Sequence, residues 1–290
     1  MINYDFYEEF EIDLTGYCNL HCDRCSRNYL HSQHLAIKNV RPLDIIIKQL
    51  EKFKNLKRCF LAGQTTEPTS YPYFIDFLKY LKSRKIRVDL FTNASILNEC
   101  LFKEIGAVLD DNDRVNFTIC GSTQELHQKY RVGSKLENII KNANALRSVR
   151  KIDYAQYIRF TYNITDWKSN KWRELGFTNY YWVESEGQRL FNEGKVKVKS
   201  KPIKQPFYDK VFSMLETKKV FNIECESLRS KKVYIDQFGK EYPCYMIAEY
   251  MKDLHFNNFS YDNVNDYFCC KLCSRECRSL CDKYDLEFIC

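Results

Sequence analysis

Three cysteines near the start of the chain have a spacing that suits iron–sulfur chemistry. Cys18, Cys22 and Cys25 are separated by three and two residues. Iron–sulfur clusters are normally held by cysteine thiolates, so these three can hold three irons of a [4Fe–4S] cube. The fourth iron then has no protein ligand and is open to a small molecule. A structural zinc site uses four ligands, and His21 could supply the fourth, so a zinc loop is the alternative interpretation.

The cysteine content of the whole chain also indicates metal binding. There are 14 cysteines among 290 residues. The first residues lack the basic and apolar regions of a signal peptide, and no apolar run reaches the roughly 18 residues of a membrane span. We therefore expect a cytoplasmic protein without a membrane partner, in which cysteines serve metals rather than disulfides. The net charge of +7 fits an anionic partner and a solvated surface equally well.

The middle of the chain alternates strand-like and helix-like segments. The expected strands are 10–14, 58–62, 88–91, 115–119, 158–162 and 180–183, and the expected helices are one that starts at Pro42 and the segments 74–81, 96–105 and 136–146. This alternation predicts an α/β fold, a partial barrel of six βα units with parallel strands. Such barrels carry their chemistry at the C-terminal ends of the strands. The cysteine loop follows the first expected strand, so it lies at that edge.

The cysteine pattern, in this position, resembles that of radical S-adenosylmethionine (SAM) enzymes over roughly residues 8–185. The resemblance implies that the open iron binds the amino and carboxylate groups of SAM. It implies an oxidoreductase or transformase that cleaves SAM to methionine and a 5′-deoxyadenosyl radical, which abstracts a substrate hydrogen. It also implies an electron donor such as flavodoxin or ferredoxin.

Further stretches at successive strand ends are similar to those that contact SAM in this family. The sequence 63–68 resembles the Gly-Gly-Glu-Pro stretch that holds the SAM amino group, and 92–94 resembles a Thr-Asn-Gly turn. Arg131 matches an arginine that could pair with the methionine carboxylate through its guanidinium fork. The candidate cofactor-binding residues are Gly63, Gln64, Thr65, Thr66, Glu67, Thr92, Asn93, Thr118, Ser122, Arg131 and Asn163, the last taken as the end of strand five. A structural role is the alternative for each, such as helix capping by Thr66 or Glu67.

Two positions depart from the family pattern. Arg24 stands where an aromatic residue often packs on adenine; its planar group can stack on a purine or face solvent. Cys120 stands at a common aspartate position, at the end of strand four and facing the barrel interior. Its thiol could give a hydrogen atom to a substrate radical, although a free cysteine is more often a small buried hydrophobe. Cys120 and Arg131 are therefore the candidate catalytic residues.

Seven cysteines in the last part of the chain resemble the SPASM extension of radical SAM enzymes, which carries two auxiliary [4Fe–4S] clusters. Residues 232–244 read as a β-hairpin whose turn centres on Gly239. The resemblance assigns Cys225, Cys244 and Cys281 to one cluster and Cys270, Cys273, Cys277 and Cys290 to the other. The spacing after Cys273 is shorter than usual. The shorter twitch variant would hold one cluster with Cys225, Cys244, Cys270 and Cys273, and zinc sites are a further alternative.

These patterns predict three parts: a radical SAM core (1–185), a bridging segment (186–224) and a small cysteine-rich α+β extension (225–290). Members with this extension mostly modify peptide or protein side chains, which is the leading substrate class. Few residues precede Cys18, so we expect a separate peptide-recognition protein or a substrate that is not a peptide. The first alternative is a sugar, an aminocyclitol or a nucleoside, including a nucleic-acid base. The second is a non-catalytic zinc protein that binds nucleic acid.

Overall fold

A single mixed sheet forms the framework of the molecule. The computed structural model describes residues 4–22, 25, 39–63, 66–184 and 230–242. Within them, eight strands lie in the order β6-β5-β4-β3-β2-β1-β7-β8. The strands are β1 (Glu9–Ile12), β2 (Arg58–Leu61), β3 (Arg87–Thr92), β4 (Arg114–Ile119), β5 (Asp153–Arg159), β6 (Asn179–Glu184), β7 (Lys232–Ile235) and β8 (Glu241–Tyr242). All neighbouring strands are parallel except β7 and β8.

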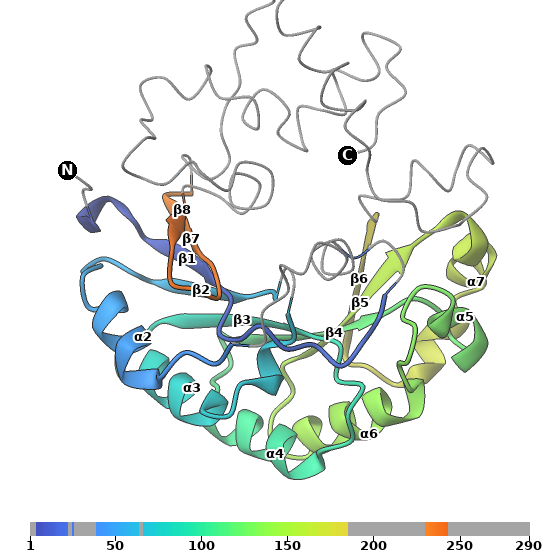
Figure 1. Ribbon diagram of the computed structural model, residues 1–290. Helices are drawn as coiled ribbons and strands as arrows, with labels where there is room; N and C mark the ends of the chain where they lie inside the picture. Colours follow the sequence, from blue (N-terminus) through green and yellow to red (C-terminus); the bar gives the residue numbers. More distant parts are fainter. Residues whose placement is uncertain (1–3, 23–24, 26–38, 64–65, 185–229, 243–290) are drawn as a thin grey trace, which may run out of the picture.

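Helices cover the convex face of this curved sheet (Figure 1). They are α2 (Leu43–Leu50), α3 (Phe74–Ser83), α4 (Glu99–Val108), α5 (Gln124–Gln128), α6 (Leu136–Arg147) and α7 (Ile164–Ser169), with 3₁₀ turns at Tyr4–Phe6, Pro68–Ser70, Thr161–Asn163 and Lys171–Leu175. The alternation of parallel strands and helices confirms the predicted partial barrel. In the described part of the chain, every helix is too short or too polar to cross a bilayer.

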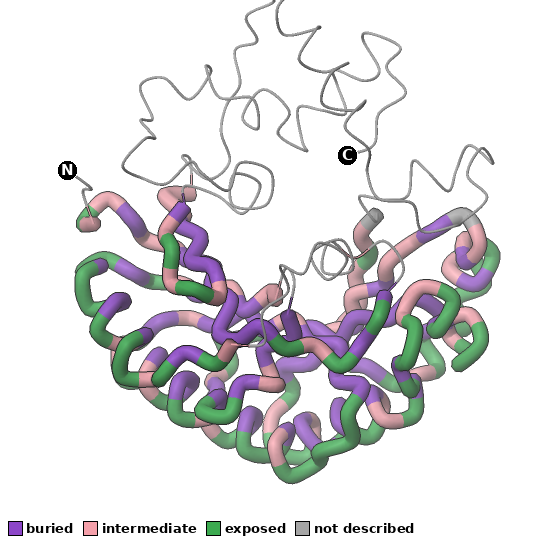
Figure 2. The backbone as a smooth tube through the Cα atoms, viewed as in Figure 1, coloured by how far each residue is buried: buried purple, intermediate pink, exposed green. Residues whose placement is uncertain are grey.

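The core lies between the sheet and the helices, because strand side chains alternate between the two faces. Phe10 and Ile12 of β1 are fully buried in the hydrophobic core. Figure 2 shows the buried segments along the sheet and the inner sides of the helices, with exposed segments outside. Glu11 and Asp13 alternate with these apolar residues and therefore point to the concave face, yet they too are buried. The concave face thus carries polar groups that must find partners.

Ion pairs occupy the N-terminal end of the concave face. Arg58 of β2 lies between Glu9 of β1 and Asp89 of β3, with nitrogen–oxygen distances of 3.4 Å and 2.5 Å. Arg87 also reaches Asp89, at 3.3 Å. These pairs fix the strand starts, whereas the C-terminal ends lead into the loops that carry the candidate site residues.

Two predicted segments were misplaced. The fifth strand was predicted at 158–162 but runs over Asp153–Arg159, so Asn163 does not end it. The Asn163 side chain accepts a hydrogen bond from the Phe160 N–H at 2.7 Å and closes a 3₁₀ turn there. The helix predicted from residue 96 begins at Glu99, because the Asn98 side chain caps the Leu101 N–H at 3.1 Å.

The predicted hairpin is present, and it extends the barrel sheet. β7 and β8 are joined by a turn in which Gly239 has a positive φ of 84°. A side chain at Gly239 would also clash with Arg41, because a Cβ atom would lie 2.7 Å from the guanidinium. β7 pairs in parallel with β1 and so adds a seventh parallel strand. The predicted boundaries near residues 185 and 225 lie outside the described residues, so the division into three parts stays a prediction.

Candidate functional site

The three N-terminal cysteines lie on the loop that leaves the C-terminal end of β1. Cys22 is buried, and Cys18 and Cys25 are partly exposed. Side chains from the end of β3 and from the segment after α5 reach this loop. The Asn93 amide, just after β3, donates to Cys18 Sγ at 3.7 Å, and Arg131 Nη1 donates to Cys22 Sγ at 3.7 Å. The loop therefore sits among donors that favour charged sulfur.

The residues present fit a thiolate-bound cluster. Burial raises the pKa of the Cys18 thiol to about 11, so it needs a metal to become a thiolate at neutral pH. Burial alone would lower the pKa of Arg131, but the charges of Cys22 and Cys120 raise it, which keeps the guanidinium cationic. Its Nε is enclosed without a hydrogen-bond partner. A cation held there calls for an anionic group, and a thiolate cluster with a bound carboxylate supplies one. Among the described residues, no group of three or more metal-binding side chains is arranged around a single ion.

The loop after β2 lies against the cysteine loop. Gly63 has a φ of 59°, and a Cβ atom there would lie 2.5 Å from the Thr66 carbonyl oxygen, so only glycine fits this turn. The backbone N–H of Glu67 donates to the Tyr17 carbonyl at 2.7 Å. Two of the predicted loop residues, Gln64 and Thr65, lie outside the described residues. The structure thus brings the Gly63–Glu67 turn next to Cys18, the residue that follows Tyr17.

The Glu67 carboxylate joins the ends of β2 and β3. It is buried, and its Oε1 accepts hydrogen bonds from the Thr92 hydroxyl at 2.6 Å and the Thr69 hydroxyl at 2.7 Å. Its Oε2 accepts one from the Asn93 N–H at 2.8 Å. Glu67 and Thr92 were both predicted to contact SAM; their side chains are hydrogen-bonded to each other, and SAM contact stays a prediction. Their contribution to the site is to fix Asn93, which holds Cys18.

Replacing Glu67 by glutamine is expected to destabilise the chain by about 2 kcal/mol, because in either orientation the amide NH2 group faces a backbone N–H, that of Asn93 or that of Thr69. Glu67→Ala is expected to cost more, since it removes every acceptor from a buried network. Urea unfolding measures both effects. Glu125→Gln, on the exposed first turn of α5, is the matched control and should leave stability unchanged. Equal stability of Glu67→Gln and the control would contradict this role.

Three more predicted residues connect neighbouring strand ends. Thr118 donates to the Thr92 carbonyl at 3.0 Å, between β4 and β3. The Asn163 amide donates to the carbonyls of Cys120 at 2.8 Å and Ile158 at 2.9 Å, between β4 and β5. Ser122 donates to the carboxylate of Asp166, which also accepts from Tyr157. These contacts hold the C-terminal edge together, and SAM contact by these residues stays a prediction.

Cys120 is enclosed at the end of β4 beside Arg131. It is fully buried, and burial raises the pKa of its thiol to about 12, partly offset by Arg131. Its backbone N–H donates to His127 Nδ1 at 3.2 Å. Since Nδ1 accepts, Nε2 carries the proton and donates to the Ser134 hydroxyl at 2.8 Å. His127 thus fixes the backbone of Cys120 and was not predicted as a site residue.

Neutral His127 is expected to make stability depend on pH. Burial, and then the charge of Arg131, lower its pKa from 6.5 to about 3. Unfolding therefore takes up a proton between these values, and the stability is full above pH 6.5 and is lost as the pH falls toward 3. Between pH 7 and pH 5 the loss is about 2 kcal/mol. Urea unfolding at both pH values, with His127→Asn as comparison, measures this; an equal loss in the variant would contradict it.

Several predicted residues cannot be placed, and some that matter were missed. Arg24 and the seven C-terminal cysteines lie outside the described residues. Asp13 and Tyr234 were missed, although both are buried and face each other at the C-terminal edge. The signal for Asp13 was a carboxylate alternating with core residues of a strand. Its partner could not be found in that way, because it comes from the other end of the chain.

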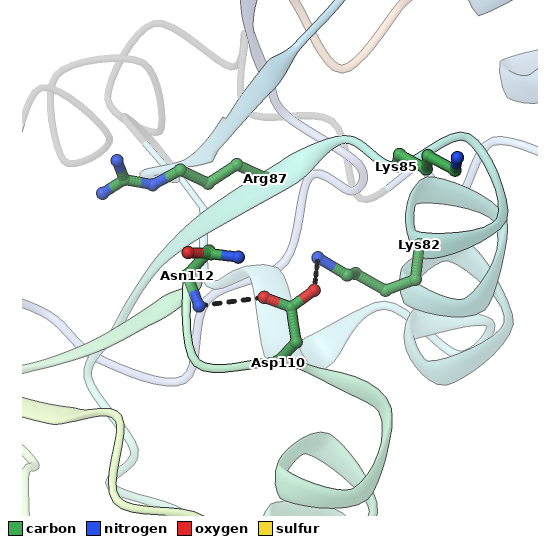
Figure 3. Close-up of a pocket in the computed structure, with 5 residues that line it drawn as sticks. All are labelled: Lys82, Lys85, Arg87, Asp110 and Asn112. Atoms are coloured by element: carbon green, nitrogen blue, oxygen red, sulfur yellow. Dashed lines mark hydrogen bonds and ion pairs between the residues drawn. The ribbon is translucent and has the colours of Figure 1, made fainter.

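A charged surface pocket lies at the opposite edge of the sheet. It is lined by Lys82, Lys85, Arg87, Asp110 and Asn112, at the starts of β3 and β4 (Figure 3). Lys82 pairs with Asp110 at 2.7 Å, and the Asn112 N–H donates to Asp110 at 2.9 Å. Because parallel strands start at this edge, the pocket is separate from the cysteine loop. These contacts fix the turn that contains Asp110 and Asn112.

One curated relative shares part of the sequence. It is the "Tungsten-containing aldehyde ferredoxin oxidoreductase cofactor-modifying protein" of Pyrococcus furiosus, which is 29% identical over 97 residues. The match covers 32% of this chain and 26% of the relative, so the chain matches about a quarter of that protein. The match is therefore to one segment and does not extend to the whole relative.

Solved structures share the fold at low sequence identity. SuiB of Streptococcus suis bound to precursor peptide SuiA matches with a TM-score of 0.56 and 16% identity over 90% of this chain and 64% of that one. Native anSMEcpe with bound SAM matches with a TM-score of 0.60 and 15% identity, over 91% of this chain and 83% of that one. The family profile described as "Radical SAM superfamily" matches residues 12–165, more than half of the chain. This match covers the cysteine loop and strands β2 to β5, and the chain belongs to the radical SAM superfamily.

Proposed function

We propose that this chain is a radical SAM enzyme with auxiliary iron–sulfur clusters that modifies a peptide or protein side chain. The observation that carries the proposal is the cysteine loop at the C-terminal edge, held between Asn93 and Arg131. Cys18, Cys22 and Cys25 would hold a [4Fe–4S] cluster. When bound and reduced, this cluster supplies the electron that cleaves SAM to methionine and a 5′-deoxyadenosyl radical.

The described residues have distinct roles in this proposal. Arg131 provides positive charge beside Cys22, where a SAM carboxylate would need it. Thr66 and the Gly63 turn offer a hydroxyl and backbone groups for the amino group. Cys120 is buried at a strand end facing the barrel, as a donor of a hydrogen atom to a substrate radical would be. The C-terminal cysteines would hold one or two auxiliary clusters that accept an electron from the substrate or bind it.

The peptide substrate rests on structural neighbours. SuiB was solved with a precursor peptide, and anSMEcpe with the Cp18Cys peptide; the latter matches with a TM-score of 0.58. Their identity to this chain is 16% and 15%, so the likeness supports the fold, and the substrate class is our proposal. An external electron donor and a separate peptide-recognition protein belong to the same proposal.

The test is an assay of the full chain after anaerobic reconstitution with iron and sulfide. We expect a brown protein with about eight to twelve irons and little zinc. With SAM and dithionite it should release 5′-deoxyadenosine, and omission of either should stop the release. Peptides encoded beside the gene should raise the rate of 5′-deoxyadenosine release, and the mass of these peptides should change. If only sugars or nucleosides raise the rate, the substrate is a small molecule and the peptide proposal is wrong. A colourless protein that contains only zinc would refute the proposal that this chain is a radical SAM enzyme.

A further inference from the structure

The β7–β8 hairpin connects the far part of the chain to the strand that carries the cysteine loop. β7 pairs with β1 from Glu9↔Lys232 to Ile12↔Ile235. The ladder continues one residue further, because the Asp13 N–H donates to the Ile235 carbonyl at 2.9 Å. Asp13 lies five residues before Cys18. The hairpin therefore fixes the backbone from which the cysteine loop starts.

A buried tyrosine of the hairpin reaches the carboxylate of Asp13. The Tyr234 hydroxyl donates to Asp13 Oδ2 at 2.9 Å. Tyr234 is 4% exposed and Asp13 is 0% exposed. Burial raises the pKa of Tyr234, and the charge of Asp13 raises it further, so the hydroxyl keeps its proton and remains the donor. A hydrogen bond to a buried carboxylate is among the stronger kinds in proteins.

The second oxygen of Asp13 faces the loop that we assign to the SAM amino group. The Thr66 hydroxyl lies 3.4 Å from Asp13 Oδ1, a longer contact than that of Tyr234. Thr66 is buried and adjoins Glu67, whose N–H holds the cysteine loop at Tyr17. Asp13 is thus the point where the hairpin, the cysteine loop and the Gly63–Glu67 turn meet.

The hairpin itself is held firmly at its turn. Gln49 of α2 donates to the Gly239 carbonyl at 2.8 Å and to Glu241 at 2.7 Å. Arg41 packs against Gly239 and donates to Gln49 at 2.5 Å. Lys231, just before β7, pairs with Glu8 at 2.5 Å. Tyr234 therefore lies on an element that is held in place. A residue that orients another side chain needs such a rigid support.

We propose that Tyr234 is a positioning residue for SAM: through Asp13 it orients Thr66, at the end of the turn that begins at Gly63, so the C-terminal hairpin sets the position of a hydroxyl that we assign to the SAM amino site. This inference rests on the proposed function, because it takes that turn as part of the SAM site. It adds a residue outside the matched range of 12–165 to the machinery of the core.

The experiment compares two tyrosines that face each other across the hairpin. Tyr234 and Tyr242 are cross-strand neighbours, and the Tyr242 hydroxyl donates instead to Asp236 at 3.3 Å. Each is changed to phenylalanine in the full reconstituted chain, and SAM affinity is measured by equilibrium dialysis. We expect Tyr234→Phe to bind SAM about tenfold more weakly and Tyr242→Phe to remain within about twofold of wild type. Iron content should be the same in all three proteins.

Hydrogen exchange provides a readout that does not depend on activity. Tyr234→Phe should speed exchange of the amides of residues 13–18 and 66–67, whereas Tyr242→Phe should affect mainly residues 236–240. Thr66→Val should reproduce the weaker SAM binding, and Thr66→Ser, which keeps the hydroxyl, should bind more tightly than Thr66→Val.

The two proposals fail in different ways. A wild-type protein that neither binds nor cleaves SAM overturns both. If wild type binds SAM and the two tyrosine variants are indistinguishable in affinity and in exchange, only the role of Tyr234 is overturned. Loss of iron from Tyr234→Phe alone would also overturn it, since the hydroxyl would then support the cluster rather than the SAM site.

Discussion

Changing Cys18, Cys22 and Cys25 together to alanine is expected to reduce 5′-deoxyadenosine formation to the level of a reaction without protein. These thiols lie on one loop among the donors Asn93 and Arg131, and in the proposed function they are the ligands of the SAM-binding cluster. The iron content should fall by about four atoms per chain, because a cubane cluster holds four. Auxiliary iron bound by the C-terminal cysteines should remain.

The control for this experiment is Cys100→Ala. Cys100 is an exposed thiol in the first turn of α4, and its loss should change neither iron content nor product formation. Retention of 5′-deoxyadenosine formation by the triple variant would refute the central assignment. Loss of all iron, including the auxiliary iron, would refute only the independence of the two kinds of cluster.

Replacing Arg131 by methionine is expected to lower the rate of 5′-deoxyadenosine formation about 100-fold. Methionine fills similar space but removes the positive charge beside Cys22. The positive charge of Arg131 is needed because the anionic cluster and the SAM carboxylate would lie close together in an enclosed site. SAM affinity should fall with the rate. The rate and SAM affinity of Arg131→Lys should lie between those of wild type and Arg131→Met, because lysine keeps the charge but lacks the guanidinium fork.

Lys129→Met tests whether any lost charge on this segment has the same effect. Lys129 lies two residues before Arg131 in the sequence and is exposed, with its Nζ 5.7 Å from the centre of the Tyr162 ring. The Lys129→Met variant should therefore have the same rate as wild type. Rates and SAM affinities of the four proteins are compared at matched iron content. If the rate of Arg131→Met is within a few-fold of the wild-type rate, the proposed role of Arg131 in SAM binding is wrong.

The sequence predicted the barrel well where its signals were local. The predicted strands 58–62 and 115–119 agree with β2 and β4 within one residue, because short β-branched and aromatic runs lie between amphipathic helices. The fifth strand was misplaced because 158–162 is equally rich in aromatic and β-branched residues. What ends the strand is a side-chain hydrogen bond from Phe160 N–H to Asn163, and that contact is not visible in composition.

The sequence predicted which segments meet at the C-terminal edge, but it does not show which groups their side chains contact within the protein. The cysteine loop, the Gly63 turn and Arg131 do gather at one edge, as matching strand ends require. However, Glu67, Thr118 and Asn163 direct their polar groups to neighbouring strand ends. A polar residue at a strand end can bind a ligand or satisfy buried backbone groups, and the sequence pattern is the same in both cases. The three-dimensional structure supplies the partners within the protein, and SAM contact by these residues stays a prediction.

The pairing of β7 with β1 has a consequence for how the chain is made. Asp13 and Tyr234 are 221 residues apart, so the partner of β1 leaves the ribosome long after β1 does. At roughly 5–20 residues per second, this delay is on the order of tens of seconds. During that time one edge of β1 has no neighbour, and open strand edges invite association with other chains. We therefore expect the nascent protein to need protection until its hairpin has been synthesised, although the cysteine loop has been available from the start.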